Sequence, residues 1–352
     1  MHTDPSFLQV LWFVLIGILW AGFLILEGFD FGVGMLVKVL GRDDVDRRMM
    51  IHTIGPVWDG NEVWLIVAGG ATFAAFPGWY SSAFSGFYLA FFLVLASLIV
   101  RGVSFEFWGK EESRVWRSGW EWAMAIASGA AALLFGVAWA NFIHGVPMGA
   151  GNIVHASLWD LLHPYALAGG LTTLSLFFAH GANFLTLRVS GELRDRAAAL
   201  ADRATPVAAI ITIGFMIWTI VDQSGRTGVL ILALLTIAKV AFIPFTRKRS
   251  EWLGFLNTVG AILLLTATYF VTLYPNALPS TTGKAYDLTL VNASSSHYTL
   301  IVMTVVAVIC VPLVLMYQAW TYWVFRHRLG RDDYEGPLNP IAVVEQKFGG
   351  TG

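Results

Sequence analysis

Charged residues are scarce in this chain. Of its 352 residues, 13% are Asp, Glu, Lys or Arg and 57% are hydrophobic, whereas a soluble globular domain usually carries about 25% charge. A lipid bilayer accounts for so much apolar surface, because each helical crossing uses roughly 20 apolar residues. The net charge is −1 and no basic stripe is present, so no nucleic-acid partner is expected. The composition therefore predicts an integral membrane protein.

Cysteine is almost absent, since Cys310 is the single thiol. One thiol excludes a disulfide within the chain, a cysteine-ligated iron–sulfur cluster and a four-cysteine zinc site. Cys310 lies in an apolar run, and a buried core position is expected for it. No cleavable signal peptide is expected, because the apolar stretch from Phe7 is too long and lacks a positively charged start. We interpret that stretch as the first membrane span.

Nine apolar segments are long enough to cross a bilayer. Helices are the only form expected for them, because lipid cannot satisfy open backbone groups and the alternation of a β-barrel strand is absent. The sequence thus predicts an all-α integral membrane protein with about nine transmembrane helices. The expected ranges are 7–38, 57–76, 81–103, 120–142, 161–187, 205–222, 228–246, 252–274 and 297–325.

Positive charge is distributed unevenly between the connections. One side holds 19 of the 22 Lys and Arg residues, the other side holds Arg226 and Lys284, and Lys239 lies within a span. The positive-inside rule therefore places the N-terminus outside and the C-terminal tail in the cytoplasm. The positively charged side comprises 38–53, 101–117, 188–203, 247–249 and the tail after 325.

Spans one to four and spans five to eight begin on the same side, which is compatible with a parallel repeat of two four-helix units plus one helix. We divide the chain into an N-terminal four-helix unit (1–142), a C-terminal four-helix unit (143–274), an outer loop with the ninth helix (275–325) and a cytoplasmic tail (326–352). Residues 188–203 alternate charge and alanine at helical spacing. An interfacial helix and a solvated helical loop both fit that pattern.

Carboxylates occur inside the first three expected spans, where a charge costs roughly 2.5–3.5 kcal/mol at a helix centre on insertion scales. The predicted orientation puts these groups in the cytoplasmic half of the membrane. Spans joined by short links are usually neighbours, so we expect four or five acids to meet at one depth. The charged residues are Glu27 and Asp30 in span one, Asp59 and Glu62 in span two, and Arg101 and Glu106 in span three.

Two interpretations of this acidic group follow from its chemistry. A hydrated inlet that takes up protons from the cytoplasm suits buried carboxylates, because burial and mutual repulsion favour proton exchange near neutral pH. The alternative is helix capping and pairing with Arg101, since negative charge is favoured in the first turns of a helix. We favour capping for Glu62 and proton transfer for Asp59 and Glu27. Both interpretations stay open for Asp30 and Glu106.

Histidine offers little support for a haem site. Of eight His residues, His180 alone lies well inside an expected span, and haem in a helical bundle usually takes axial ligands from facing helices. A hydrogen-bonded core position is the favoured interpretation of His180. Lys239 is a further charge within a span, and it either snorkels to the interface or meets an acid such as Asp222 or a partner chain.

Three long segments carry a family resemblance. The segments GFDFGVGMLVKVLGRDDVDRRMMIHTIGPVWDGNEVWLIVAGGATFAAFP and FSGFYLAFFLVLASLIVRGVSFEFW, and near the end NASSSHYTLIVMTVVAVICVPLVLMYQAWTYWVF, resemble subunit II of cytochrome bd-type quinol oxidases. The resemblance covers nearly the whole chain in the right order, and WDGNEVWL together with GFDFGVG is specific. One departure is the short link near 223–227, where some members have a long insertion.

The resemblance implies a fold of two four-helix bundles with one peripheral helix. It further implies a bacterial inner-membrane complex that oxidises quinol and reduces dioxygen to water, building a membrane potential without pumping. In that family two haems b and one haem d are ligated by subunit I, so no cofactor or quinol site is expected here. Expected partners are subunit I, small accessory membrane subunits, lipid and quinone.

The family's hydrophilic route for protons implies roles for particular residues of this chain. It matches Glu27 or Asp30, Asp59 and Glu106, with Trp64 nearby. Where some members carry Asp, this chain has Glu27 and Glu106, which retain a carboxylate. A scaffold that stabilises subunit I without conducting protons is an alternative. Another is a secondary transporter or ion permease with a cytoplasm-facing acidic site, although the broken helices typical of that class are not evident.

Overall fold

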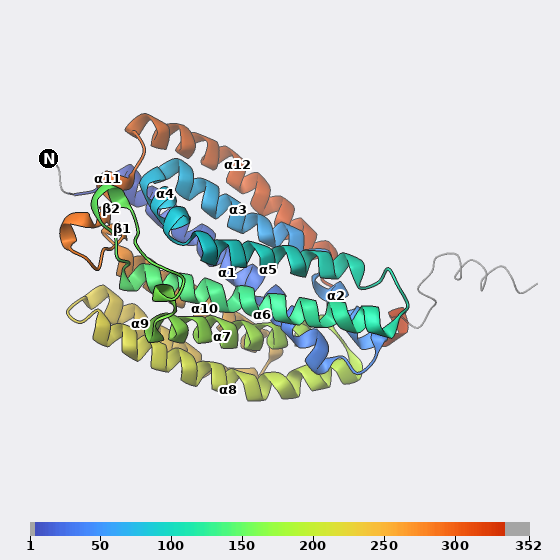
Figure 1. The fold of residues 1–352 in the computed structure, drawn as a ribbon. Helices are drawn as coiled ribbons and strands as arrows, with labels where there is room; N and C mark the ends of the chain where they lie inside the picture. Colours follow the sequence, from blue (N-terminus) through green and yellow to red (C-terminus); the bar gives the residue numbers. More distant parts are fainter. Residues whose placement is uncertain (1–3, 335–352) are drawn as a thin grey trace, which may run out of the picture.

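The computed structural model describes residues 4–334. Within this range the chain forms an elongated bundle of long helices, with the start of α1 and two short strands at one end and α2 at the other (Figure 1). The helices are α1 (Phe7–Leu40), α2 (Asp44–Ile54), α3 (Trp58–Ala75), α4 (Pro77–Gly86), α5 (Tyr88–Phe107), α6 (Arg114–His144), α7 (Pro164–Arg188), α8 (Gly191–Asp222), α9 (Thr227–Arg247), α10 (Glu251–Leu273), α11 (Leu290–Ala293) and α12 (His297–Val324). The strands are β1 (Asn276–Leu278) and β2 (Leu288–Thr289), and the 3₁₀ turns are η1 (Ala150–Asn152), η2 (Asp160–Leu162), η3 (Lys284–Tyr286) and η4 (Arg331–Tyr334).

Local sequence signals explain where several helices begin and end. Ser6 caps α1 in a capping box with Gln9, and Ser296 caps α12; such caps satisfy the free N–H groups of a first turn. The α6 helix ends at Gly145, whose φ of 95° is the left-handed conformation that favours glycine. Pro164 occupies the first position of α7, where its missing N–H costs no hydrogen bond.

The predicted all-helical membrane architecture is confirmed in its main features. Seven helices of the described chain are long and apolar enough to cross a membrane, namely α1, α5, α6, α8, α9, α10 and α12. The expected ranges agree with α1, α9, α10 and α12 to within two residues, whereas α5 begins seven residues later and α6 six residues earlier than expected. The largest difference is at 191–203, which forms the first part of α8 and continues through Pro206. Leu193, Ala197 and Ala201 on this stretch are buried, so it packs against the protein as part of one long helix.

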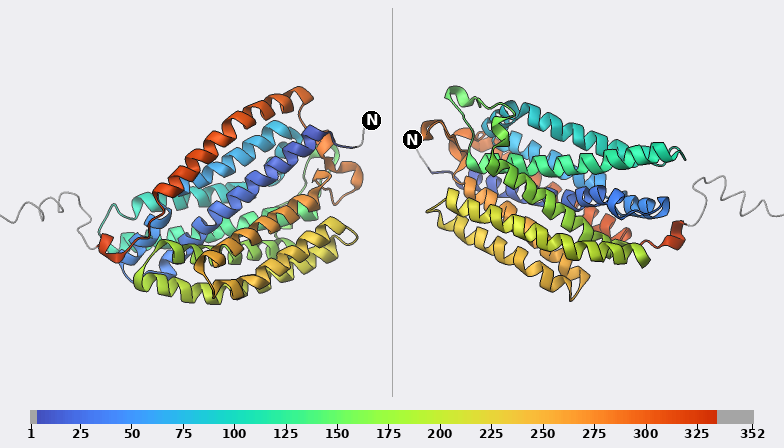
Figure 2. Two further views of the ribbon diagram at one scale, coloured as in Figure 1. Left: turned by 180° about the vertical axis from the view of Figure 1, so that it is seen from behind. Right: turned by 60° about the horizontal axis from the view of Figure 1, so that its bottom comes forward.

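Helix α1 lies at the centre of the arrangement. It contacts α3, α6, α7 and α10, and the left panel of Figure 2 shows α12 along one edge of the bundle beside α3 and α1. Close helix approach is possible where α1 and α7 meet at Gly32 and Gly181. A Cβ built on Gly32 would lie 2.6 Å from the Cα of Gly181, so both positions need the small residue.

Helix α12 is peripheral and exposed along most of its length. Trp12 of α1 anchors it by donating from Nε1 to the carbonyl of Leu300 and to the hydroxyl of Thr304, at 3.2 and 3.0 Å. The prediction of a buried Cys310 is wrong, because this residue is exposed on α12. Apolar surroundings in the sequence of a membrane helix do not distinguish a protein core from a face that meets lipid or a partner.

Ion pairs tie the helices together at the α2 end of the bundle. Glu121 of α6 accepts from Lys38 of α1 at 2.7 Å and lies 3.3 Å from Arg47 of α2. Asp46 of α2 accepts from Arg196 of α8 at 2.6 Å, and Arg331 of η4 lies 2.5 Å from Asp43. Of the predicted tail 326–352, only residues up to 334 belong to the described part of the chain, so Lys347 lies outside it.

At the opposite end, the connection between α6 and α7 pairs with the connection between α10 and α12. The amide of Val146 donates to the carbonyl of Pro279 at 3.1 Å, and the amide of Thr281 donates back to Val146 at 2.9 Å. Strands β1 and β2 form an antiparallel pair beside this contact. These backbone hydrogen bonds close one end of the bundle.

Candidate functional site

A buried ion pair joins α1 to α5. The Nη1 atom of Arg101 donates to Oε2 of Glu27 at 2.6 Å, and both side chains are fully buried. The same nitrogen lies 3.4 Å from Oε1 of Glu62 on α3, which is 21% exposed. The guanidinium also stands over the rings of Phe31 and Phe105, 4.8 and 5.3 Å from their centroids. Three helices thus bring one cation and two carboxylates together in an apolar surrounding.

A second carboxylate of α1 leads to a chain of hydrogen bonds. Asp30 follows Glu27 by three residues and lies on the same helix face, about 60° away around the axis. Its Oδ2 atom accepts from Nδ2 of Asn61 on α3 at 2.7 Å, and Asp30 is fully buried. Oδ1 of Asn61 accepts from the hydroxyl of Tyr322 on α12 at 2.7 Å. Asp30 is therefore linked through one amide to the peripheral helix.

Trp64 takes part in the same contact between α3 and α12. Its Nε1 donates to Oε1 of Gln318 at 2.9 Å, and Nε2 of Gln318 lies 3.4 Å from Oδ1 of Asn61. The ring of Trp64 also packs on Gly22 of α1. We call the set of Glu27, Asp30, Asn61, Glu62, Arg101 and Tyr322 the polar cluster.

Several atoms of the polar cluster remain without a hydrogen-bond partner among residues 4–334. They are Oε1 of Glu27, Oδ1 of Asp30, and Nε and Nη2 of Arg101. A buried polar atom without a partner costs about 1–3 kcal/mol, and more when it is charged. Such atoms are the kind of polar partner that buried ordered water requires.

The two other predicted acids do not join the cluster. Asp59 lies in the first turn of α3 and Glu106 in the last turn of α5, and both are exposed. Glu106 follows Arg101 by five residues, which turns it about 140° away around the helix. Asp59 precedes Glu62 by three residues, so the two side chains lie on nearly the same side of α3, about 60° apart around the axis. The structure thus brings together Glu27, Asp30 and Glu62, while Asp59 and Glu106 lie on the outer surfaces of α3 and α5.

Three uncharged members of this region were not foreseen from the sequence. Asn61, Gln318 and Tyr322 come from α3 and α12, two helices far apart in the sequence. The available signal was a polar residue within an apolar span: Asn61 in WDGNEVW, and Gln318 followed four residues later by Tyr322 on one side of α12. Their meeting depends on tertiary packing, which the spacing does not give.

His180 is held on both sides within the core. Nδ1 lies 2.6 Å from the hydroxyl of Thr258, and Nε2 lies 3.1 Å from the carbonyl oxygen of Ile25. The ring stacks on Phe255 at a centroid distance of 4.8 Å. Since a carbonyl only accepts, the arrangement fits a neutral imidazole with its proton on Nε2. The predicted hydrogen-bonded core role of His180 agrees with these contacts.

Lys239 of α9 is half-buried, and its stem lies against Gly260 of α10. No ion pair involves Lys239 within the range 4–334, and no group of three or more His, Cys, Asp or Glu residues in that range is arranged to hold a metal ion.

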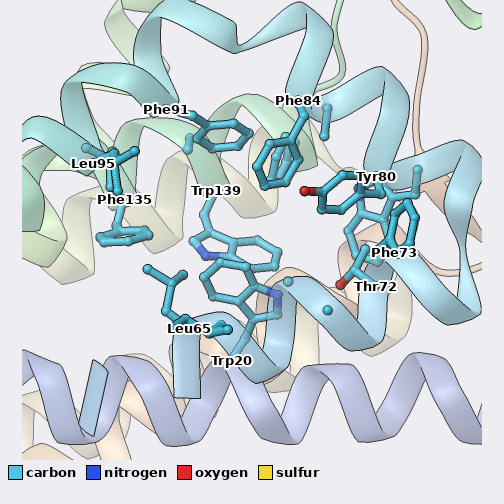
Figure 3. Close-up of a pocket in the computed structure, with 18 of the residues that line it drawn as sticks. Trp20, Leu65, Thr72, Phe73, Tyr80, Phe84, Phe91, Leu95, Phe135 and Trp139 are labelled. Carbon is cyan, nitrogen blue, oxygen red and sulfur yellow. The ribbon is translucent and has the colours of Figure 1, made fainter. Parts of the chain in front are cut away.

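An apolar cavity of about 720 Å³ opens between α1, α3, α4, α5 and α6. Figure 3 shows that Trp20 of α1, Phe91 of α5, and Phe135 and Trp139 of α6 point into it, and Tyr80 and Phe84 bound one side. Its lining contains no Asp, Glu, Lys, Arg or His. The cavity therefore suits an apolar chain, and no carboxylate, amine, guanidinium or imidazole lines it.

Known proteins resemble this chain over nearly its whole length. The family model described as cytochrome bd terminal oxidase subunit II matches residues 8–325. Cytochrome bd ubiquinol oxidase subunit 2 of Bacillus subtilis is 38% identical over 331 residues, covering 93% of this chain and 98% of that protein. Cytochrome bd-I ubiquinol oxidase subunit 2 of Escherichia coli is 36% identical over 376 residues, covering 94% and 98%.

The fold also has a counterpart among solved structures. The bd oxidase from Geobacillus thermodenitrificans superposes with a TM-score of 0.72 at 15% identity, covering 92% of this chain and all of the matched chain. Identity this low shows a shared fold only, whereas the family match and the identities above 30% show common descent. The chain belongs to the cytochrome bd terminal oxidase subunit II family.

Proposed function

We propose that this chain is the subunit of a quinol-oxidising, oxygen-reducing terminal oxidase that does not ligate haem, and that it supplies protons from the cytoplasm to its partner. The observation that carries the proposal is the polar cluster, in which Glu27, Asp30 and Glu62 surround Arg101 inside an apolar helix bundle. Ionisable groups within a membrane are costly, and they commonly mark paths for protons or ions.

Haem is proposed to reside in the partner, subunit I, with two haems b and one haem d in the complex and quinol as reductant. Axial haem ligation needs a free histidine or methionine directed into a shared pocket. His180, the histidine deep within the helix bundle, does not fit that need, because both of its ring nitrogens are engaged by Thr258 and Ile25. We therefore propose that electron transfer takes place in the partner and not in this chain.

For the proton path we propose an entrance at Asp59 and Glu106 and an inner station at Glu27 and Asp30. Glu62 is partly exposed and lies 3.4 Å from Arg101, so we assign it the step between the exposed acids and the buried pair. The unpartnered atoms of Glu27, Asp30 and Arg101 supply sites for the water that would carry protons onward. Arg101 donates to Oε2 of Glu27 at 2.6 Å and so fixes the position of this carboxylate within the cluster.

We further propose that subunit I covers the exposed faces of α3 and α5. Asp59 and Glu106 are exposed there beside apolar residues such as Ile66, Phe92 and Ile99. Exposing a carboxylate to lipid is energetically costly. Contact with a protein partner or with trapped water lowers that cost. The same cover would carry the proton path from this chain into the partner. Small accessory membrane subunits remain candidates for the exposed surface of α12.

We also propose nine membrane crossings, the seven apolar helices together with α3 and α7. Helix α3 carries Asp59 and Glu62, which lower its mean hydropathy, and most of α7 is buried inside the protein. The mutual contacts of α1, α3, α5 and α6, and those of α7 to α10, support two four-helix bundles with α12 peripheral. We keep the divisions at residues 1–142, 143–274, 275–325 and 326–352 as part of this proposal.

For the orientation we propose that the N-terminus faces the outside of the bacterial inner membrane and the α2 end faces the cytoplasm. The excess of Lys and Arg at the α2 end supports this orientation. The apolar cavity of Figure 3 is proposed to take a lipid or quinone tail.

The proton path is tested by Asp59→Asn and Glu27→Gln in the purified complex, with oxygen uptake driven by quinol. We expect turnover to fall on the order of 10²-fold, the lower end of what a positioned proton-transfer group contributes, while the haem absorption spectrum stays normal. Glu112→Gln, which neutralises an exposed acid between α5 and α6, is the matched control and should leave turnover unchanged.

Unchanged turnover of Asp59→Asn and Glu27→Gln with a normal haem spectrum would instead support a scaffold that conducts no protons. The subunit role itself is tested separately: membranes that lack this chain should lose quinol oxidase activity.

A further inference from the structure

A second groove opens at the α2 end, between α1, α7, α10 and α12. Its volume is about 350 Å³. The floor is apolar and consists largely of Phe29, Phe184, Phe255 and Val259. It runs from Trp252 to Val259 along α10, seven residues or about 10 Å. This length matches the first part of a lipid acyl chain entering the membrane.

Two arginines at this groove have no carboxylate partner among residues 4–334, unlike two other arginines at the same end of the bundle. Arg188, at the end of α7, is half-buried over the ring of Phe184 at 6.0 Å, and within residues 4–334 no carboxylate lies in ion-pair range of it. Arg326, just beyond α12, donates to the carbonyl of Trp323 at 2.6 Å and likewise meets no carboxylate in that range. By contrast, Arg194 and Arg328 at the same end both pair with Glu251, at 2.7 and 2.9 Å.

A phosphate group complements this pair of cations. Guanidinium groups bind phosphate with charge-assisted and often bidentate hydrogen bonds. Basic pockets between membrane helices on the cytoplasmic side commonly bind anionic lipid headgroups. Trp252 is exposed at the same level, as an aromatic ring at the membrane interface would be.

We propose that this groove is a binding site for one anionic phospholipid, with its phosphate between Arg188 and Arg326 and an acyl chain along the floor. The lipid fastens α12 to α7 and α10, helices with which α12 otherwise has few contacts. Tyr322 forms part of the groove wall and donates to Asn61, the partner of Asp30. An occupied groove thus holds α12 in the position that completes the polar cluster. Lipid binding itself depends on the two arginines and the apolar floor, so its test does not require the proton path.

The proposal is tested on the purified complex by native mass spectrometry and by binding of short-chain phosphatidylglycerol after delipidation. The Arg188→Gln/Arg326→Gln variant should lose the retained lipid and bind phosphatidylglycerol about 25-fold more weakly, since each basic side chain beside an anionic lipid contributes roughly five-fold. Phosphatidylcholine should bind weakly to both proteins. Arg188→Lys/Arg326→Lys keeps both charges and should keep most of the binding.

The matched control is Arg114→Gln/Arg203→Gln, which removes two exposed positive charges from α6 and α8. It should retain lipid as the unaltered complex does. Equal binding of phosphatidylcholine, retention of lipid by the Arg188→Gln/Arg326→Gln variant, or recovery of quinone in place of phospholipid would each overturn the proposal. So would a delipidated complex that binds no phosphatidylglycerol, because a partner subunit would then fill the groove.

Discussion

Asp30 of α1 and Tyr322 of α12 are joined by a single side chain, the amide of Asn61. The amide nitrogen donates to Asp30 at 2.7 Å, and the amide oxygen accepts from the Tyr322 hydroxyl at 2.7 Å. These two hydrogen bonds fix which end of the amide faces the carboxylate. The peripheral helix therefore orients a donor toward a buried acid that it does not itself touch.

Tyr322→Phe should weaken this arrangement without disturbing the bundle. Removal of the hydroxyl leaves Oδ1 of Asn61 with only its longer contact to Gln318, and an incompletely satisfied buried acceptor costs about 1–3 kcal/mol. We expect a matching fall in the free energy of unfolding, measured by denaturation in mixed micelles. Tyr317→Phe, on the exposed side of the same helix, is the control. Equal effects of the two substitutions would contradict the orienting role of Tyr322.

The ion pair of Glu27 and Arg101 predicts a non-additive response to substitution. Arg101→Gln alone leaves a buried carboxylate without its cation, and the loss of one partner of a buried pair typically costs about 3–5 kcal/mol. The double variant Glu27→Gln/Arg101→Gln removes both charges and should be more stable than Arg101→Gln. Thermal unfolding of the complex, followed by tryptophan fluorescence and haem absorbance, measures both. A double variant that is less stable than Arg101→Gln would rule out this coupling.

The contact between Gly32 and Gly181 makes α1 and α7 sensitive to a single methyl group. A Cβ on Gly32 would overlap the carbonyl oxygen of Phe177, so Gly32→Ala must push the helices apart. Overpacking of this kind costs roughly 1–3 kcal/mol, occasionally more, and we expect a lower thermal midpoint and a lower yield of the complex.

A glycine in open space provides the comparison for Gly32. A Cβ on Gly119 of α6 meets no atom within 4 Å, and alanine in a helix interior is favoured over glycine by about 0.5–1 kcal/mol. Gly119→Ala should therefore leave the thermal midpoint unchanged or raise it slightly. A Gly32→Ala variant as stable as Gly119→Ala would show that the two helices can separate freely.

Much of the helical architecture could be predicted from the sequence, because long apolar runs in a membrane have few alternatives to helix. The first run was predicted at 7–38 and forms Phe7–Leu40. The start of α8 could not be predicted in the same way. Its first residues are polar, and they become part of the helix through tertiary burial of Leu193, Ala197 and Ala201.

The candidate site was only partly accessible to sequence reasoning. Glu27 and Asp30 share a helix face by their spacing, and they do meet Arg101 or Asn61. The five-residue spacing of Arg101 and Glu106 already places them on different sides of a helix, so the separation of Glu106 from the cluster could have been predicted from the sequence. The contact of Tyr322 with Asn61 spans 261 residues of sequence, and neither local spacing nor hydropathy specifies a pairing of that range. The proton role of these groups stays a prediction.

A pH dependence follows from His163, which lies outside the helices at the start of α7. Burial and the neighbouring positive charge of His144 lower the pKa of His163 below its usual 6.5. Its Nδ1 accepts from the amide of Ala166 at 3.4 Å, and Nε2 lies 3.2 Å from Oδ1 of Asn141. The folded protein therefore favours the neutral ring, and protonation removes the cap of α7.

The sign of the effect follows from proton linkage. A histidine whose pKa is lowered on folding binds more protons in the unfolded state, so stability rises with pH across the window just below and around 6.5. The contribution is complete above that window and is lost as the pH falls through the lowered pKa. We expect the thermal midpoint of the complex to fall from pH 7 to pH 5, and His163→Gln to flatten that slope.

His155→Gln, in the same connection and exposed, should leave the slope as it is. A His163→Gln variant with the unaltered slope would assign the pH dependence to other groups, of which His52, whose pKa burial also lowers, is the first to substitute.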